Sequence, residues 1–594
     1  MNGIITPALK VPKQIRTMLS FAPINVRKIE AWLNDLPRAN LGMMSKQLYH
    51  AVVELNQLKV APDIRLEMME SMRPSIYYVC HQLSQHFLGQ VIVLSPQQRK
   101  VANLALTLLY HLSTGYKHIV LDLLARNKPG QDQVLLANAT HRAISDISHN
   151  LLQALQLFAP IPQSIWLELN QLYLLAEQKK ILNHQLEDNQ NTHQHAISIA
   201  DCYKRIVMLC CSRPNQVRQQ SLCQIFHSLE LWGNVIEIAP ATSHHGEFII
   251  AVNRDTGPKH TALVNDTISD NHRIINSAEL RNKLKEFINT PSGQRETLSL
   301  TVPEGLTDDL INHLIKAWGP LQSRAFKRTS SAGSKLMITV GLSATHYYYT
   351  DEIEFKEWLH GPEQDIAQKH HASSADTWSS SFAAANTQRI TNNNSSSSTI
   401  EGSAANRQAE NQAKKPYPLF TTELMNSSPG GYCVNWQGNL PNQLQTGELV
   451  GLHEDNSRNW SLAVIRWIKL LSDQQAQLGI ELLTPNAKPC AVALLKKVDD
   501  DSQFMRGFFI PPIKALSQPA SLIAPKVPFQ VGHKVKLSQG AEIYKGQLVQ
   551  QITSTGSFSM FELQGQDTPK EDHKQTGSKD DTSDEDFSSL WEML

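Results

Sequence analysis

Apolar residues recur at helical spacing through the first 232 residues of the chain. In three stretches they fall at intervals of three and four, which is typical of a buried helix face. Proline and glycine interrupt this pattern repeatedly. It therefore predicts helical hairpins over residues 27–232, arranged as a bundle or an irregular solenoid. The stretches are Met44, Leu48, Val52, Leu55 and Leu58; Val101, Leu104, Ala105, Leu108 and Leu112; and Ile165, Leu169, Leu172 and Ala176, with breaks expected near Arg73-Pro74, Gly89, Ser95-Pro96, Pro129-Gly130, Pro160, Pro162 and Pro214.

Between residues 233 and 300 the pattern becomes mixed. Glu247–Val252 and Thr261–Val264 are short apolar runs that predict strands, and Ser277–Ile288 predicts a helix. These elements indicate a small α+β connector. A further helix is expected over residues 306–318, because Thr307 is a suitable N-cap residue.

Alternating apolar and polar positions dominate the C-terminal half of the chain. Short strands at this spacing predict an antiparallel barrel or sandwich. The strands over residues 527–564 either complete the same barrel or form an additional small β module. The expected strands are Leu336–Val340, Tyr432–Trp436, Glu448–Leu452, Trp460–Ile468, Gly479–Leu483, Lys534–Leu537, Gly546–Val549 and Phe558–Leu563.

Two segments lack the apolar residues that a core requires. Residues 350–415 are rich in Ser, Asn, Ala and Gln, and we expect a disordered low-complexity insertion. Residues 566–594 form an acidic tail, also expected to be disordered. The tail ends in an apolar segment that is either a docking peptide for a protein partner or a frayed end. Its apolar residues are Phe587, Leu590, Trp591 and Leu594.

Composition and charge argue against several classes of protein. The 594 residues carry 55 Lys and Arg against 55 Asp and Glu, so a surface built wholly to hold nucleic acid is not expected. No run of about 18 apolar residues predicts a membrane span. The seven cysteines are sparse, odd in number and form no CxxC pair, which favours reduced thiols in a cytoplasmic protein. His244-His245 has no second ligand cluster, so no metal site is expected.

Two short motifs carry the candidate chemistry. Arg324 and Arg328 form an RxxxR pair, and Asn426, Ser428 and Gly431 form an NxSxxG turn within MNSSPGGYCVNW. Each motif alone is weak evidence, because RxxxR is common on helix faces and NxSxxG is common in turns. Arginine offers a planar fork that binds phosphates or guanine edges, and its flat face stacks on bases. Asparagine and serine add polar groups, and glycine allows close backbone approach.

Taken together with the following strands, these motifs resemble the PilZ domain, a bacterial receptor domain for cyclic di-GMP. The resemblance is best over residues 416–486, where the NxSxxG turn leads into strands containing GELV, VIRW and LGIEL. It implies a β-barrel and a cyclic di-GMP site formed by Arg324, Arg328, Asn426, Ser428 and Gly431. The chain departs from the family because Arg328 and Asn426 are 98 positions apart. A long insertion in a surface loop explains this separation, since loop-closure entropy grows only logarithmically with length.

Three functions are compatible with these observations. The first is a cyclic di-GMP receptor that relays the signal to a protein partner through its helical region, with an output in biofilm, motility or pilus control. The second is an interaction scaffold whose degenerate PilZ barrel has lost nucleotide binding. The third is an enzyme, but the chain contains no P-loop and no HExxH motif. We therefore expect no catalytic residue, no cofactor besides the ligand, no nucleic-acid partner and no metal.

The expected fold class is multidomain: an all-α N-terminal region, a small α+β connector and a C-terminal antiparallel PilZ-like barrel interrupted by an insertion. The expected segments are an arm (1–26), the helical region (27–232), the connector (233–300), a helix with the RxxxR segment and the first barrel strand (301–349), the insertion (350–415), the remainder of the barrel (416–515), a small β module (527–564) and the tail (566–594).

Overall fold

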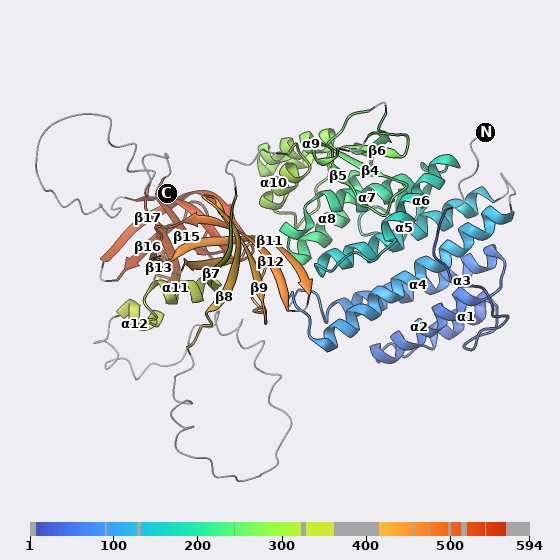
Figure 1. Cartoon of the computed structure of the whole chain (residues 1–594), viewed down its shortest axis with the longest axis horizontal. Coiled ribbons are helices and arrows are strands. Elements are labelled where there is room, and N and C mark those ends of the chain that lie inside the picture. The colour runs from blue at the N-terminus through green and yellow to red at the C-terminus, as the bar shows by residue number, and fades with distance from the viewer. Residues whose placement is uncertain are drawn as a thin grey trace, which may run out of the picture. The chain divides into compact units, whose positions relative to one another are not determined.

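The computed structural model of the chain describes residues 7–565, with internal gaps (Figure 1). The expected insertion and the acidic tail fall mostly or wholly outside the described residues, as does Arg324. The undescribed internal residues are 90–91, 127–131, 243, 266, 322–327, 361–414, 455–456, 458, 473, 497–500, 513–518 and 541.

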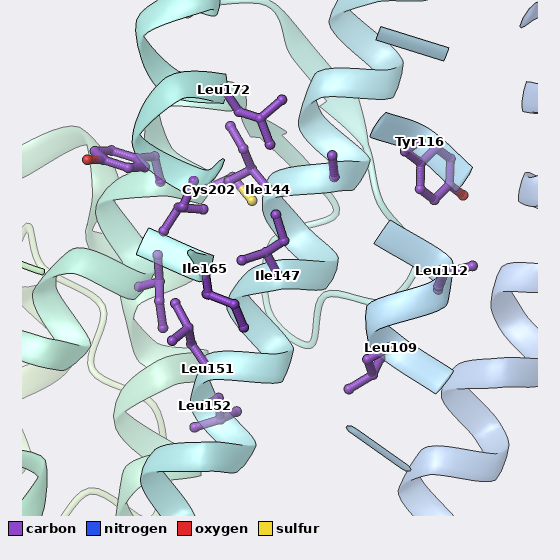
Figure 2. Packing of buried hydrophobic residues seen from close by; sticks show 14 of the residues in the cluster. Leu109, Leu112, Tyr116, Ile144, Ile147, Leu151, Leu152, Ile165, Leu172 and Cys202 are labelled. Carbon is purple, nitrogen blue, oxygen red and sulfur yellow. The ribbon is translucent and has the colours of Figure 1, made fainter. Parts of the chain in front are cut away.

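The N-terminal region is helical, as predicted, and its helices share one apolar core. Figure 2 shows side chains of α4, α5, α6 and α7 directed into this core, among them Leu112, Ile147 and Leu172. A short hairpin of strands β1 and β2 interrupts the helices. The elements are α1 (Val26–Asn34), α2 (Leu41–Gln57), α3 (Pro62–Ser84), α4 (Pro96–Arg126), α5 (Gln133–Gln156), α6 (Ile165–Gln178), β1 (Gln185–Glu187), β2 (Ala196–Ser198), α7 (Ile199–Cys211) and α8 (Gln219–Trp232).

One expected helix break is wrong. Helix α3 continues through Pro74 instead of ending at Arg73-Pro74. Proline in a helix interior removes one hydrogen bond and costs about 3 kcal/mol. Here Arg73, just before Pro74, is held by buried ion pairs, and Ile76, two residues after it, is buried in the apolar core; these contacts offset the cost.

The mixed segment that follows forms a four-stranded antiparallel sheet and two helices. The strand order is β3-β6-β4-β5. The strand expected at Thr261–Val264 is wrong, because residues Thr261–Leu263 form a 3-10 turn after His260, whose ring accepts a hydrogen bond from the Ala262 N–H. The elements are β3 (Glu237–Pro240), β4 (Phe248–Ala251), β5 (Lys259–His260), β6 (His272–Asn276), α9 (Ala278–Asn289) and α10 (Asp308–Ala317).

Helix α10 begins as the sequence predicts but joins a different core. The Thr307 hydroxyl accepts a hydrogen bond from the Leu310 N–H at 3.3 Å. After the helix, Trp318 is fully buried, donates its indole N–H to the Met208 carbonyl at 3.0 Å and lies edge-on to Trp232. We expected this helix to belong with the first barrel strand; instead it completes the core of the helical region.

The remaining strands close into two six-stranded barrels. In the first, the order around the barrel is β10-β11-β12-β9-β8-β7, and helices α11 and α12 follow β7. The elements are β7 (Thr329–Val340), α11 (Leu342–Tyr349), α12 (Phe355–His360), β8 (Phe420–Ser428), β9 (Gly431–Gln437), β10 (Leu449–Glu454), β11 (Ser461–Ser472) and β12 (Gln475–Thr484).

The second barrel has the order β13-β14-β15-β18-β17-β16, so the strands after residue 527 form a barrel with the three strands before them. The expected barrel boundary near residue 515 is wrong, because β13 and β14 belong to the second barrel. The strands are β13 (Lys488–Leu494), β14 (Met505–Ile510), β15 (Ser521–Pro525), β16 (Lys534–Gln539), β17 (Glu542–Ser554) and β18 (Phe558–Gly565).

Candidate functional site

The second predicted motif lies on the hairpin of strands β8 and β9. Asn426 and Ser428 are half-buried near the end of β8, and Gly431 begins β9 after a turn of two residues. The Ser428 hydroxyl donates a hydrogen bond to the Gly431 carbonyl at 3.2 Å, which ties the two sides of the turn together. Gly431 has a φ of 147°, a backbone angle that residues with a side chain rarely adopt. The turn therefore requires glycine at this position.

Arg328 lies immediately before β7, and its side chain is exposed. In the first barrel β8 lies between β7 and β9 (Figure 1). The Thr422 hydroxyl donates to the Leu336 carbonyl at 3.3 Å, which fixes the pairing of these neighbouring strands. Arg328 and the NxSxxG turn are 98 positions apart in sequence, but the barrel places β7, which Arg328 precedes, beside β8, which leads into the turn.

The positive charge of Arg328 acts on a residue of β9. Burial raises the pKa of the Cys433 thiol, and the positive charge of Arg328 acts in the opposite direction on it. Cys433 follows Gly431 by two residues on the same strand. The Arg328 charge thus acts at the start of β9, next to the turn that carries Ser428 and Gly431.

Among the predicted site residues, the structure brings Arg328 together with the turn of Asn426, Ser428 and Gly431. Arg324 lies outside the described residues, so the arginine pair as a whole stays a prediction. The assembled groups are an exposed guanidinium, a hydroxyl, an amide and an unhindered backbone. They are suited to binding an anion that also has hydrogen-bonding edges, such as a nucleotide.

Sequence reasoning missed two neighbours of this site. One is Cys433. Its position, two residues after Gly431 on a predicted strand, was the signal in the sequence that it lies near the site. The other is a close pair on β11 and β12: a side chain at Gly479 would overlap the Trp467 indole, so the ring lies flat over the glycine. Glycine in the middle of a predicted strand is a signal for such a close approach.

The chain matches family models along nearly its whole length. Residues 27–242 match the N-terminal domain of the cyclic-di-GMP receptor FimW, residues 247–489 match its middle PilZ domain, and residues 490–565 match its C-terminal β-barrel domain. The chain is also 35% identical to the cyclic-di-GMP receptor FimW of Pseudomonas aeruginosa, with 99% of each chain covered. The chain belongs to the FimW family.

Membership in the FimW family agrees with the fold described above. The middle FimW domain contains the first barrel, as the PilZ resemblance predicted, and the separate C-terminal FimW domain coincides with the second barrel. The FimW middle-domain match also begins before α9 and α10, so it includes most of the α+β sheet. No solved structure matches the chain.

Other candidate chemistry is sparse in the part of the chain that the structure describes. There, no group of three or more His, Cys, Asp or Glu side chains is arranged to hold a metal ion. All seven cysteines fall within the described ranges, and none forms a disulfide. No helix in those ranges is both long enough and apolar enough to cross a membrane.

Proposed function

We propose that this chain is a cyclic di-GMP receptor whose ligand binds at the junction of β7 with the β8–β9 turn. The observation that carries the proposal is the position of Arg328 beside this turn, across an insertion that separates the two motifs in sequence. The name of the Pseudomonas aeruginosa relative supports the same ligand.

Each proposed contact has a chemical reason. Arg328, and Arg324 before it, would supply guanidinium groups that grip phosphate oxygens or guanine edges in a bidentate manner. Asn426 and Ser428 would meet the polar edges of the guanines, and Gly431 would let the ligand approach the backbone. These roles require binding and no bond cleavage, so the proposed activity is that of a receptor and not of an enzyme.

Isothermal titration of cyclic di-GMP into the full chain tests the proposal. We expect saturable binding that Arg328→Ala weakens by about tenfold or more, since it removes a charged bidentate contact. Lys335→Ala is the matched control, because Lys335 is an exposed cation on β7, the strand that Arg328 precedes, and lies seven residues after Arg328. It should bind as the wild type does.

The outcomes separate the alternatives. If Arg324→Ala weakens binding and Arg328→Ala leaves it unchanged, the ligand does not bind beside β7. No binding by the wild-type chain would contradict the receptor and favour an interaction scaffold with a degenerate PilZ barrel.

We further propose that ligand binding changes how the chain engages a protein partner through its helical region, with an output in biofilm, motility or pilus control. A ligand can drive such a relay only if it binds two conformations with different affinity. Affinity capture by the full chain, with and without cyclic di-GMP and with Arg328→Ala, tests this step. A partner retained equally in all three conditions would contradict the relay.

A further inference from the structure

The outer face of the second barrel carries a strip of lysines. Val535 and Leu537 of β16 are buried in the barrel core, so the alternating residues Lys534 and Lys536 point outward. On the neighbouring strand β17, Leu548 is in the core and Lys545 points outward. We call Lys534, Lys536 and Lys545 the basic strip.

Two members of the basic strip face each other directly. Lys536 pairs with Lys545 in the register of β16 and β17, which sets their Cβ atoms about 5 Å apart. Like charges opposite each other destabilise a sheet. Among the described residues, the acidic group that relieves this repulsion lies beside Lys536, whose Nζ is 3.7 Å from Asp501. Within the described ranges, no ion pair involves Lys534 or Lys545.

The basic strip is separate from the apolar face that meets the first barrel. On that face, Phe508, Ile523 and Phe558 of the second barrel cluster with Leu449 and Leu462 of the first. These three residues lie on β14, β15 and β18, whereas the basic strip lies on β16 and β17. Lys534 and Lys545 are therefore available to another acidic group.

The chain leaves the second barrel beside this strip. Strand β18 ends at Gly565, which pairs with Gly546, the residue next to Lys545. The sequence that follows, residues 566–594, contains nine Asp and Glu residues and three Lys residues, a formal net charge of −6. Its first acidic residue, Asp567, comes two positions after the strand, and Asp580–Asp586 contains its densest acidic run.

We propose that the acidic segment 566–594 docks on the basic strip of its own chain. The 14 residues between Gly565 and Asp580 let Asp580 reach up to about 50 Å from Gly565 when extended, which is more than the distance back to the adjacent strands. A short tether gives the segment an effective concentration on the order of millimolar, so individually weak ion pairs suffice. Docking offsets the repulsion between Lys536 and Lys545. It also prevents the basic strip and the acidic segment from binding other charged partners.

Zero-length carbodiimide cross-linking of the full chain tests the docking, because it joins carboxylates only to amines in direct contact. We expect tail carboxylates to link to Lys534, Lys536 and Lys545, with several-fold fewer links in high salt. Lys526 is the matched control, since it is exposed and follows β15, three strands away from β16 around the barrel. A mixture of isotopically heavy and light chains distinguishes links within one chain from links between copies.

A second measurement avoids dependence on cross-linking. Acetylation of the three strip lysines by an amine-reactive reagent should be about threefold faster in a variant with a neutralised acidic run than in the wild type. The variant carries Asp580→Asn, Asp581→Asn, Asp584→Asn, Glu585→Gln and Asp586→Asn. Lys526 should react equally in both. Links confined to mixed heavy–light pairs would make the occupant a second copy and overturn the proposal. Equal labelling of Lys526 and the basic strip would also overturn the proposal. Strip lysines that react at the same rate in the wild type and the variant would overturn it as well, and this result is expected if the strip binds a different partner.

Discussion

Arg73 and Asp188 form a two-pronged ion pair inside the helical region, although they are 115 positions apart. Arg73 Nη1 lies 2.5 Å from Asp188 Oδ1, and Nη2 lies 2.9 Å from Oδ2. Both side chains are buried, which by itself raises the pKa of Asp188, but the charge and hydrogen bonds of Arg73 outweigh burial and hold that pKa below its usual value. Because Asp188 directly follows β1, the pair fixes the β1–β2 hairpin to helix α3.

Asp188→Asn should therefore destabilise the helical region strongly. The substitution leaves the buried Arg73 with one fewer compensating charge, a change that costs about 3–5 kcal/mol in comparable buried pairs. Urea unfolding followed by circular dichroism measures the loss. Asp308→Asn serves as the control, because its partner Arg295 lies 2.8 Å away in an exposed pair worth less than about 1 kcal/mol. Similar losses in both variants would show that the buried pair does not hold the hairpin.

A buried histidine predicts acid sensitivity of the barrels. His346 of α11 is fully buried, with its ring 5.0 Å from that of Trp358 and 5.8 Å from that of Phe508. Burial, assisted by the positive charge of Arg506, lowers the pKa of His346 to about 3. The neutral form is therefore favoured in the folded state. Its contribution to stability is present above pH ~6.5, the unfolded pKa, and is lost as the pH falls toward 3.

His346→Phe should make the stability of the chain less dependent on pH. Between pH 6.5 and 4.5 the wild type should lose up to about 1.4 kcal/mol per pH unit from this residue alone, and the variant should lose correspondingly less. Thermal unfolding at several pH values measures the slope of stability against pH. A packing cost that is the same at every pH does not change this slope. His360→Gln, an exposed substitution at the end of α12, should keep the wild-type slope. An unchanged slope in His346→Phe would refute the assignment.

Local signals in the sequence predicted most helices and strands. The exceptions depend on packing between residues that are far apart in the sequence. Thr307 capped its helix as expected because capping involves only the next three residues. Pro74 did not end α3, since Arg73 is held by Asp188, a partner that no local rule could supply. Strands β13 and β14 contain runs of consecutive buried residues instead of an alternating pattern, so the alternation that predicted other strands did not indicate them or the barrel that they join.

The candidate site was predictable to a similar extent. Residue types and spacing indicated Arg328 and the turn at Ser428 and Gly431 as candidates, while the insertion between them obscured their proximity. Strand order in the barrel resolved that question because β7 and β8 are neighbours. The influence of Arg328 on Cys433 was not predictable, since it depends on where an exposed arginine outside any strand comes to lie.

The flat packing of Trp467 on Gly479 predicts that this glycine cannot be replaced without cost. A methyl group at residue 479 would overlap the indole, so Gly479→Ala must displace the ring or separate β11 from β12. Overpacking of this kind costs about 1–3 kcal/mol. Chemical denaturation of the full chain measures the loss, and Gly532→Ala is the control for strain alone, because its φ is 88° and no atom lies near the added methyl. A loss no larger than that of the control would contradict the packing.

Gly431→Ala should separate the stability of the turn from its proposed role in binding. Gly431 and Gly438 flank β9, and both have positive φ, 147° and 92°. An alanine at either position strains the backbone by about 1 kcal/mol, so the two variants should lose similar stability. Only Gly431 lies at the turn beside Arg328, so Gly431→Ala alone should weaken cyclic di-GMP binding, by about tenfold in titration calorimetry, because the added methyl holds the ligand off the backbone. Equal affinity in the two variants would place the ligand away from the β8–β9 turn, whereas equal weakening would mean that general strain in β9 controls binding.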